Sequence, residues 1–250
     1  MGSLLGAVLL ILTPVVDAKP AKAAPSFASE GTELTAYAPS TASITLELIT
    51  RKFAETDAKI NTLKAIFHQS VRMEGSDVVQ TVEGDVVFKK PDLLRLTHRI
   101  PEPQTVVSDG AWLWVYRNST NQVIQSRLDA WRRSEPLAQG LLDFGKSADL
   151  LTRYAAAITT VTSMGADGHR SFTLTLRPKT TNTTGEAAEF VLTLKASTKD
   201  FFPGEATLRV GRAVIRSLFA DVRLNAELSA ETFKFTPPPD ADLFKSPEPK

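Results

Sequence analysis

The stretch from Gly84 to Tyr116 constrains the fold of this chain most, because several strand-like segments follow one another there with only short connections between them. The segments read VEGDVVFKK, LLRLTHRI, TVVSDG and AWLWVY, and Pro91, Pro101, Pro103 and Gly110 separate them. An Asp-Gly pair between two apolar runs is typical of a hairpin turn. We therefore predict consecutive antiparallel strands in this stretch, and we interpret Ser108-Asp109-Gly110 as a turn and not as a catalytic site.

Apolar and polar residues also alternate in four later segments. The apolar members are Phe172, Leu174 and Leu176; Phe190, Leu192 and Leu194; Val214, Leu218, Ala220, Val222 and Leu224; and Phe233 with Phe235. A period of two places one face of a strand toward the core and the other toward solvent, which is typical of antiparallel sheets.

Helical spacing is confined to two places. Residues 43–58 predict an amphipathic helix with Ser43 as its N-cap, and residues 134–155 predict one or two short helices. A sheet with one apolar face must bury that face, and little else is available to cover it. We predict a mainly β protein with a single strongly curved antiparallel sheet, forming an unclosed β-barrel covered by short α-helices.

The N-terminal residues suggest export. Residues 3–16 are apolar and uncharged, but this run is shorter than the roughly 20 residues that span a bilayer. We predict a signal peptide over 1–23, a flexible linker over 24–42, a folded domain over 43–244 and a tail over 245–250. No Lys or Arg precedes the apolar run, which is unusual for a signal peptide, so an uncleaved anchor or an interfacial segment is the alternative.

The composition removes several function classes. The net charge is +1, so no basic field attracts nucleic acid, and the absence of cysteine excludes disulfides, thiolate catalysis and attachment of lipid to an N-terminal cysteine. The three histidines are isolated, and no nucleophile elbow, P-loop or dinucleotide-binding motif is present. We predict a protein that is not an enzyme and that has no metal and no cofactor.

The alternation instead predicts an apolar cavity under a helical lid. The predicted cavity residues are Val86, Phe88, Leu94, Leu96, Trp112, Trp114, Phe172, Leu174, Phe190 and Leu192. The predicted lid residues are Leu137, Leu141, Leu142 and Phe144. The strand from 112 to 116 has two apolar faces, so its aromatic side chains form either a cavity wall or part of the core.

Several ordered motifs can be compared with a known family. They are Leu63-Lys64-Ala65-Ile66-Phe67-His68-Gln69, the G-x-x-x-F-K-K-P pattern from Gly84 to Pro91, V-S-D-G at 107–110, L-W-x-Y at 113–116, and Phe233-Lys234-Phe235 before Pro237-Pro238. In this order they make the chain from Thr45 to Phe244 resemble the periplasmic lipoprotein carriers of the LolA type. The resemblance implies that Lys90 and Arg95 lie at the rim of the cavity. Lys90 stands where well-known members have an Arg tied to lid closure, and Lys lacks the planar fork of Arg.

The resemblance implies a function. A carrier of this type shields the acyl chains of lipoproteins, or of another lipid, in an apolar cavity during transfer through the periplasm to the outer membrane. It also implies a monomer that meets an inner-membrane ABC-type release complex and an outer-membrane acceptor. The alternative is a periplasmic regulator or scaffold of the same fold that senses lipids or lipoproteins.

Overall fold

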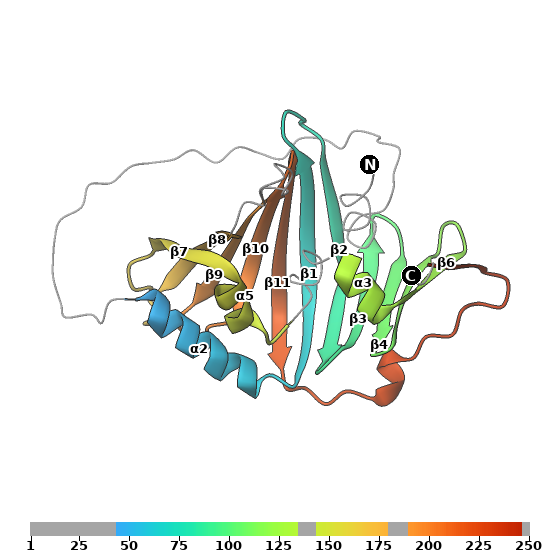
Figure 1. Ribbon diagram of the computed structural model, residues 1–250, viewed down its shortest axis with the longest axis horizontal. Helices are drawn as coiled ribbons and strands as arrows, with labels where there is room; N and C mark the ends of the chain where they lie inside the picture. The colour runs from blue at the N-terminus through green and yellow to red at the C-terminus, as the bar shows by residue number, and fades with distance from the viewer. Residues whose placement is uncertain (1–43, 135–143, 180–189, 247–250) are drawn as a thin grey trace.

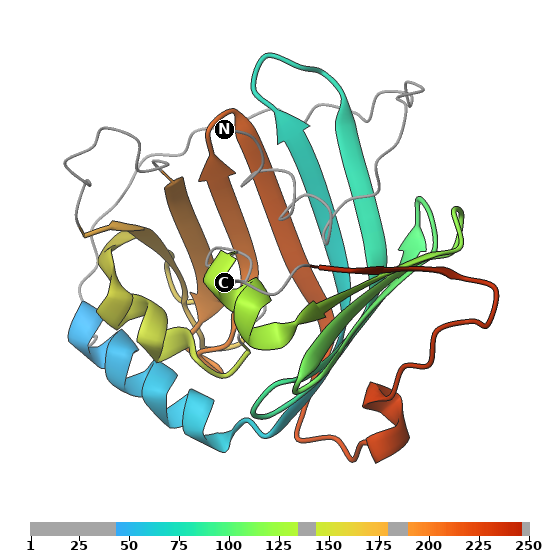
Figure 2. The same cartoon turned by 45° about the vertical axis from the view of Figure 1, so that its right-hand side comes forward.

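The computed structural model describes residues 44–134, 144–179 and 190–246, and these residues are built around one twelve-stranded sheet (Figure 1). The strand order across the sheet is β12-β6-β5-β4-β3-β2-β1-β11-β10-β9-β8-β7. The strands are β1 (Thr62–Met73), β2 (Val79–Lys89), β3 (Leu93–Ile100), β4 (Gln104–Asp109), β5 (Trp112–Arg117), β6 (Gln122–Arg127), β7 (Tyr154–Val161), β8 (Ser171–Pro178), β9 (Phe190–Ser197), β10 (Pro203–Val210), β11 (Ala213–Leu224) and β12 (Asp242–Lys245). The sheet is strongly curved and does not close, which confirms the predicted fold class (Figure 2).

The helices are short and lie within the curve of the sheet (Figure 2). They are α2 (Leu46–Lys59), α3 (Leu128–Ser134) and α5 (Ser147–Arg153). The N-cap of α2 is Thr45 and not the predicted Ser43, because the Thr45 hydroxyl accepts a hydrogen bond from the Leu48 amide at 3.2 Å. Within the part of the chain described, no helix has both the length and the apolarity needed to cross a membrane.

Strand register places the apolar side chains on one continuous face. Residues paired across neighbouring strands share a face, and Leu63, Phe88 and Leu94 are paired in succession across β1, β2 and β3. We call the face that bears these residues the inner face, and the face that bears Val87 and Arg95 the outer face. The helices α2, α3 and α5 contribute side chains to the clusters on the inner face.

Two clusters divide the inner face. The β3 cluster lies over β1 to β5 and contains Leu63, Phe67, Val82, Val86, Phe88, Leu94, Leu96, Val106, Leu113 and Val115, with Leu128 of α3 and Phe144. The β9 cluster lies over β8 to β11 and contains Phe172, Leu174, Leu176, Phe190, Leu192, Leu194, Leu208 and Ile215, with Ile49 and Phe53 of α2 and Leu150 of α5. The two halves of the sheet are therefore covered by different helices.

The C-terminal segment covers part of the outer face. Residues 233–235, predicted as a strand, instead contribute to a 3-10 helix, η1 (Ala230–Phe233), and to the extended chain that follows it. The Phe235 ring lies 5.7 Å from the ring of Trp114 and 6.1 Å from that of Tyr116. Further along, β12 pairs in parallel with β6, so this part of the Pro-rich end forms an edge strand.

The predicted apolar face of β11 is wrong at its beginning. Ala213, Ile215 and Ser217 are buried on the inner face, whereas Leu218 is exposed. The pairing of β1 with β11 shifts register opposite Lys64 and Ile66, and Asp221 in this part of β11 has a φ of +50°. An extra residue in a strand reverses the alternation, and Val222 and Leu224 beyond it pack against the β3 cluster.

Candidate functional site

The structure brings most of the predicted cavity residues together on the inner face. Val86, Phe88, Leu94 and Leu96 lie in the β3 cluster, and Phe172, Leu174, Phe190 and Leu192 lie in the β9 cluster. All of them are buried. The inner face thus carries an apolar cluster on each half of the curved sheet.

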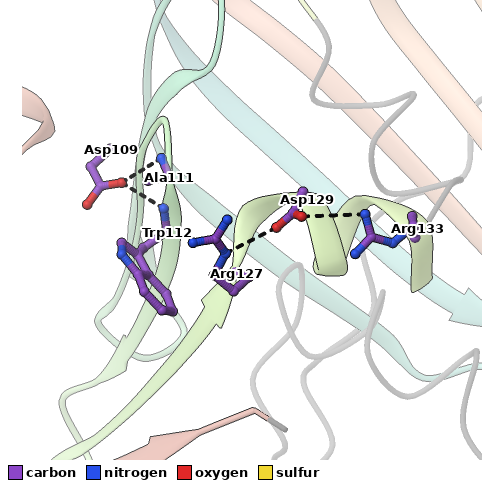
Figure 3. A network of polar contacts seen from close by, with 6 residues as sticks. All are labelled: Asp109, Ala111, Trp112, Arg127, Asp129 and Arg133. Carbon is purple, nitrogen blue, oxygen red and sulfur yellow. Dashed lines mark hydrogen bonds and ion pairs between the residues drawn. The ribbon is translucent and has the colours of Figure 1, made fainter. Parts of the chain in front are cut away.

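The prediction that Trp112 and Trp114 line the same space is wrong. Trp114 is paired with Val107, which is paired with Arg95, so Trp114 lies on the outer face. Trp112 lies on the same face of β5, with the guanidinium of Arg127 at 5.3 Å from its ring centroid (Figure 3). The inner face of β5 carries Leu113 and Val115 instead.

The turn before β5 is the predicted one. The Asp109 carboxylate accepts hydrogen bonds from the amides of Ala111 and Trp112 at 2.9 and 2.7 Å, and Gly110 has a φ of +95° (Figure 3). A side chain that accepts bonds from amides two and three residues later closes a tight turn. Ser108 is buried and its hydroxyl donates to the Asp92 carbonyl at 2.7 Å, so it supports the same turn.

A small cavity lies between the two clusters in the part of the chain that the structure describes. A cavity of about 40 Å³ is lined by residues of both clusters and of the segment between α3 and α5, among them Phe144, Leu150, Leu192, Leu194, Phe202 and Phe219. This volume holds only a few water molecules. An elongated apolar ligand can enter here only if the covering side chains move away from the sheet.

Phe144 is the one predicted lid residue that the structure describes, since Leu137, Leu141 and Leu142 lie outside the described residues, as do the predicted signal peptide and linker. Its ring lies 5.7 Å from the ring of Phe88 and 5.3 Å from that of Phe219, edge-on to the latter. Phe144 therefore covers the middle of the inner face, where β1, β2 and β11 meet.

Lys90 lies at one end of this cover. Its ammonium group donates a hydrogen bond to the backbone carbonyl of Asp57, in the last turn of α2. Its side chain also lies against Gly145, where a Cβ atom would come within 2.9 Å of Lys90 Cε. Lys90 thus connects the end of β2 to α2, which covers the β9 cluster, and to Gly145, which follows Phe144.

Asp57 links α2 to α5. Its buried carboxylate accepts a hydrogen bond from the Ala148 amide at 2.8 Å, in the first turn of α5. The residue before that helix, Lys146, makes no capping bond with its own side chain, so Asp57 takes this role from a different helix. Burial raises the pKa of the Asp57 carboxyl, and the amides of Ala148 and Ser147 and the charge of Lys90 oppose the shift.

The other predicted rim residue, Arg95, lies on the outer face. Its guanidinium donates to the Thr232 carbonyl of η1 at 3.3 Å. Arg95 therefore holds the C-terminal segment and does not contact the helices of the inner face. Alternation along LLRLTHRI already separates Arg95 from Leu94 and Leu96, and this was the available indication in the sequence.

Sequence reasoning missed several residues of the site. Leu113, Val115, Phe202 and Phe219 contribute to the inner face, as does the contact of Asp57 with α5. For Leu113 and Val115 the apolar character of both strand faces concealed the choice of side. Among the residues described, no group of three or more His, Asp or Glu side chains is arranged to hold a metal ion.

Comparisons with known proteins agree with this architecture. The family model for the outer membrane lipoprotein carrier protein LolA matches residues 58–236. The outer-membrane lipoprotein carrier protein of Nitrosospira multiformis is 29% identical over 184 residues, covering 73% of this chain and 81% of that protein. The carrier protein of Photobacterium profundum is 30% identical over 185 residues, covering 74% and 82%.

A solved structure, a LolA superfamily protein from Nitrosomonas europaea, matches with a TM-score of 0.41 at 16% identity and covers 77% of this chain and 99% of that one. The match of the family model spans most of the sheet, from the end of α2 to the residues after η1. The chain therefore belongs to the LolA family of outer membrane lipoprotein carrier proteins.

Proposed function

We propose that this protein is a periplasmic carrier that shields the acyl chains of a lipoprotein, or of a related lipid, against the inner face of its sheet. The observation that carries the proposal is the pair of apolar clusters on the inner face, which are covered by short helices and not by a second sheet. Each CH₂ group removed from water stabilises a complex by about 0.8 kcal/mol, so acyl chains have a strong tendency to bind such a surface.

In the proposed cycle, the inner face is covered by the chain's own side chains when no cargo is bound, and we call this the closed state. Phe144 and the residues of α3 and α5 occupy the inner face when it is empty, and acyl chains of similar apolarity would replace them. Because the displaced contacts must be given up, the net affinity is smaller than the burial of the acyl chains alone would provide. A carrier needs this balance, since it must also pass its cargo on.

Lys90 is proposed to stabilise the closed state. Its hydrogen bond to the Asp57 carbonyl and its contact with Gly145 are both formed while the inner face is covered. Under this proposal, residues 1–23 are the cleaved signal peptide and 24–42 a linker. An inner-membrane release complex and an outer-membrane acceptor are the proposed partners, and the protein acts as a monomer without catalytic activity.

Photolabelling tests the proposed binding surface. A fatty acid that carries a diazirine along its acyl chain is bound, irradiated and located by mass spectrometry of the peptides. We expect labels on inner-face residues of β3 and β5, such as Leu96 and Val115, and none on Trp114 or Tyr116 of the outer face. Labels confined to the outer face, or no saturable labelling, would contradict the proposal.

A further inference from the structure

At one end of the inner face, polar side chains follow the apolar ones of the β3 cluster. His98 follows Leu94 and Leu96 on the same face of β3, and register places it beside Gln104 of β4, which lies beside Arg117 of β5. Gln69 of β1 lies on the same face, two residues beyond Phe67. We call Gln69, His98, Gln104 and Arg117 the polar row.

Three members of the polar row are buried, and Arg117 is half-buried. His98 is 2% exposed, and Gln69 and Gln104 are each 4% exposed. The Phe67 ring reaches across Gly84 to lie 5.4 Å from the His98 ring, and a Cβ at Gly84 would come within 2.7 Å of Phe67 Cε1. Glycine at this position therefore lets an apolar ring and a polar ring meet at the boundary of the β3 cluster.

Several polar atoms of the row have no partner among the described residues. Gln69 Nε2 donates to Ser217 Oγ at 3.0 Å, but Gln69 Oε1, His98 Nε2, and Arg117 Nε and Nη2 are shielded from solvent without a hydrogen bond. A buried donor or acceptor without a partner costs free energy, and a charged one costs more. Such groups on the inner face are suited to a ligand that brings its own polar atoms.

The chemistry of the row favours oxygen acceptors. Arg117 offers N–H donors on a permanent positive charge, which make their strongest hydrogen bonds to carboxyl oxygens. Burial lowers the pKa of His98 to about 4, so its imidazole is neutral near pH 7 and adds no second charge. A neutral imidazole nitrogen can donate to a carbonyl oxygen or accept from an amide.

The position of the row matches the shape of an amphiphile. His98 lies four residues beyond Leu94 along β3, a distance of about 13 Å at the usual rise of a strand. Lys90 and the end of α2 are at the opposite end of β2 and β3. An acyl chain lying along β3 over Leu94 and Leu96 would therefore present its head group to the polar row.

We propose that the polar row binds the carboxyl-derived oxygens at the head of the cargo's acyl chains. These are the ester or amide carbonyls of an acylated protein, or the carboxylate of a free fatty acid. The inference rests on the proposed carrier function and adds the part of the site that recognises the head group and fixes the direction of the chain.

The test compares two fluorescent probes with the same acyl chain, one ending in a carboxylate and the other in an alcohol. Arg117→Met should weaken binding of the acid about tenfold while changing binding of the alcohol less than about twofold. The matched control is Arg177→Met, which removes an exposed Arg from the outer face of β8 and should change neither affinity. Competition by a triacylated lipopeptide that carries only ester and amide groups then distinguishes carbonyls from a carboxylate.

Stability measurements separate recognition from folding. Arg117→Met removes buried donors without a partner, so its urea midpoint should equal or exceed that of the parent chain. Arg117→Lys retains the charge and should keep part of the preference for the acid. Equal weakening of acid and alcohol by Arg117→Met, or no weakening of either, would overturn the polar row as a head-group site. Binding of neither probe by the parent chain would overturn the carrier function itself.

Discussion

At the scale of single residues, Lys90 and Arg95 separate the two faces of the sheet. Both were predicted at the rim, but Lys90 contacts the end of α2 and Arg95 contacts η1 on the outer face. Lys90→Met should loosen the cover and raise the affinity for an apolar fluorescent probe about two- to tenfold, because one hydrogen bond of the closed state is lost. Titration of the probe measures this.

Two variants control for the Lys90 substitution. Lys89→Met removes a neighbouring exposed charge, and Arg95→Met removes the contact with Thr232, and neither should alter probe affinity. A response of Arg95→Met as large as that of Lys90→Met would contradict the assignment of Arg95 to the outer face.

Asp57 gives a second prediction, in the pH dependence of stability. Because burial raises its pKa above 3.8 in the folded state, the folded chain holds this proton more tightly than the unfolded chain does. Stability from this group is therefore present at low pH and falls as pH rises through the two pKa values. Asp57→Asn keeps an acceptor for the Ala148 amide without the charge. The free energy of unfolding of this variant, relative to that of the parent chain, should therefore increase when the pH is raised from about 3 to about 7.

Urea unfolding of both proteins at the two pH values measures this difference, and other titrating groups cancel in the comparison. Asp57→Ala is the matched control, because it removes the acceptor as well and should cost about 1 kcal/mol as a lost cap. A parent chain that gains stability over Asp57→Asn as pH rises would contradict the expected direction of the pKa shift.

At the scale of elements, the helices are anchored to different extents. Ile49 and Phe53 of α2 are fully buried, and the Phe53 ring lies 6.2 Å from that of Phe172. In contrast, α3 is seven residues long and its Trp131 is only partly buried against the β3 cluster. We expect amide hydrogen exchange to be faster in α3 than in α2, and acyl-lipid binding to change exchange in α3 more. Mass spectrometry of peptides covering the two helices measures both, and a larger ligand effect in α2 would identify α2 as the moving cover.

The sequence predicts the strands correctly where apolar and polar residues alternate regularly. The prediction is wrong where a bulge interrupts that alternation. The strands around Gly84–Tyr116, Phe172 and Phe190 follow from a period of two. The bulge in β11, which reverses its faces, leaves no pattern that a period of two can reveal. Alternation does not decide the face of Trp112 and Trp114, because both faces of β5 are apolar. The outer face is covered by a segment more than a hundred residues later in the chain, at Phe235.

At the scale of the whole molecule, the proposed function depends on one curved sheet whose inner face is covered by helices. The predicted fold class follows from the number of alternating strands and the shortage of helices, and the sheet order confirms it. The polar row was not predicted, since His98, Gln104 and Arg117 come from three different strands and meet only through register. The division of the inner face into two clusters depends on where the helices pack, which spacing alone does not determine.

Native mass spectrometry of the protein with a triacylated lipopeptide tests the central claim most directly. The protein is mixed with the acylated peptide and, separately, with the same peptide lacking its acyl chains. The account predicts a one-to-one complex with the acylated peptide only, and loss of that complex when excess fatty acid competes for the inner face. No complex, or equal binding of the peptide without acyl chains, would contradict the claim that the inner face shields acyl chains.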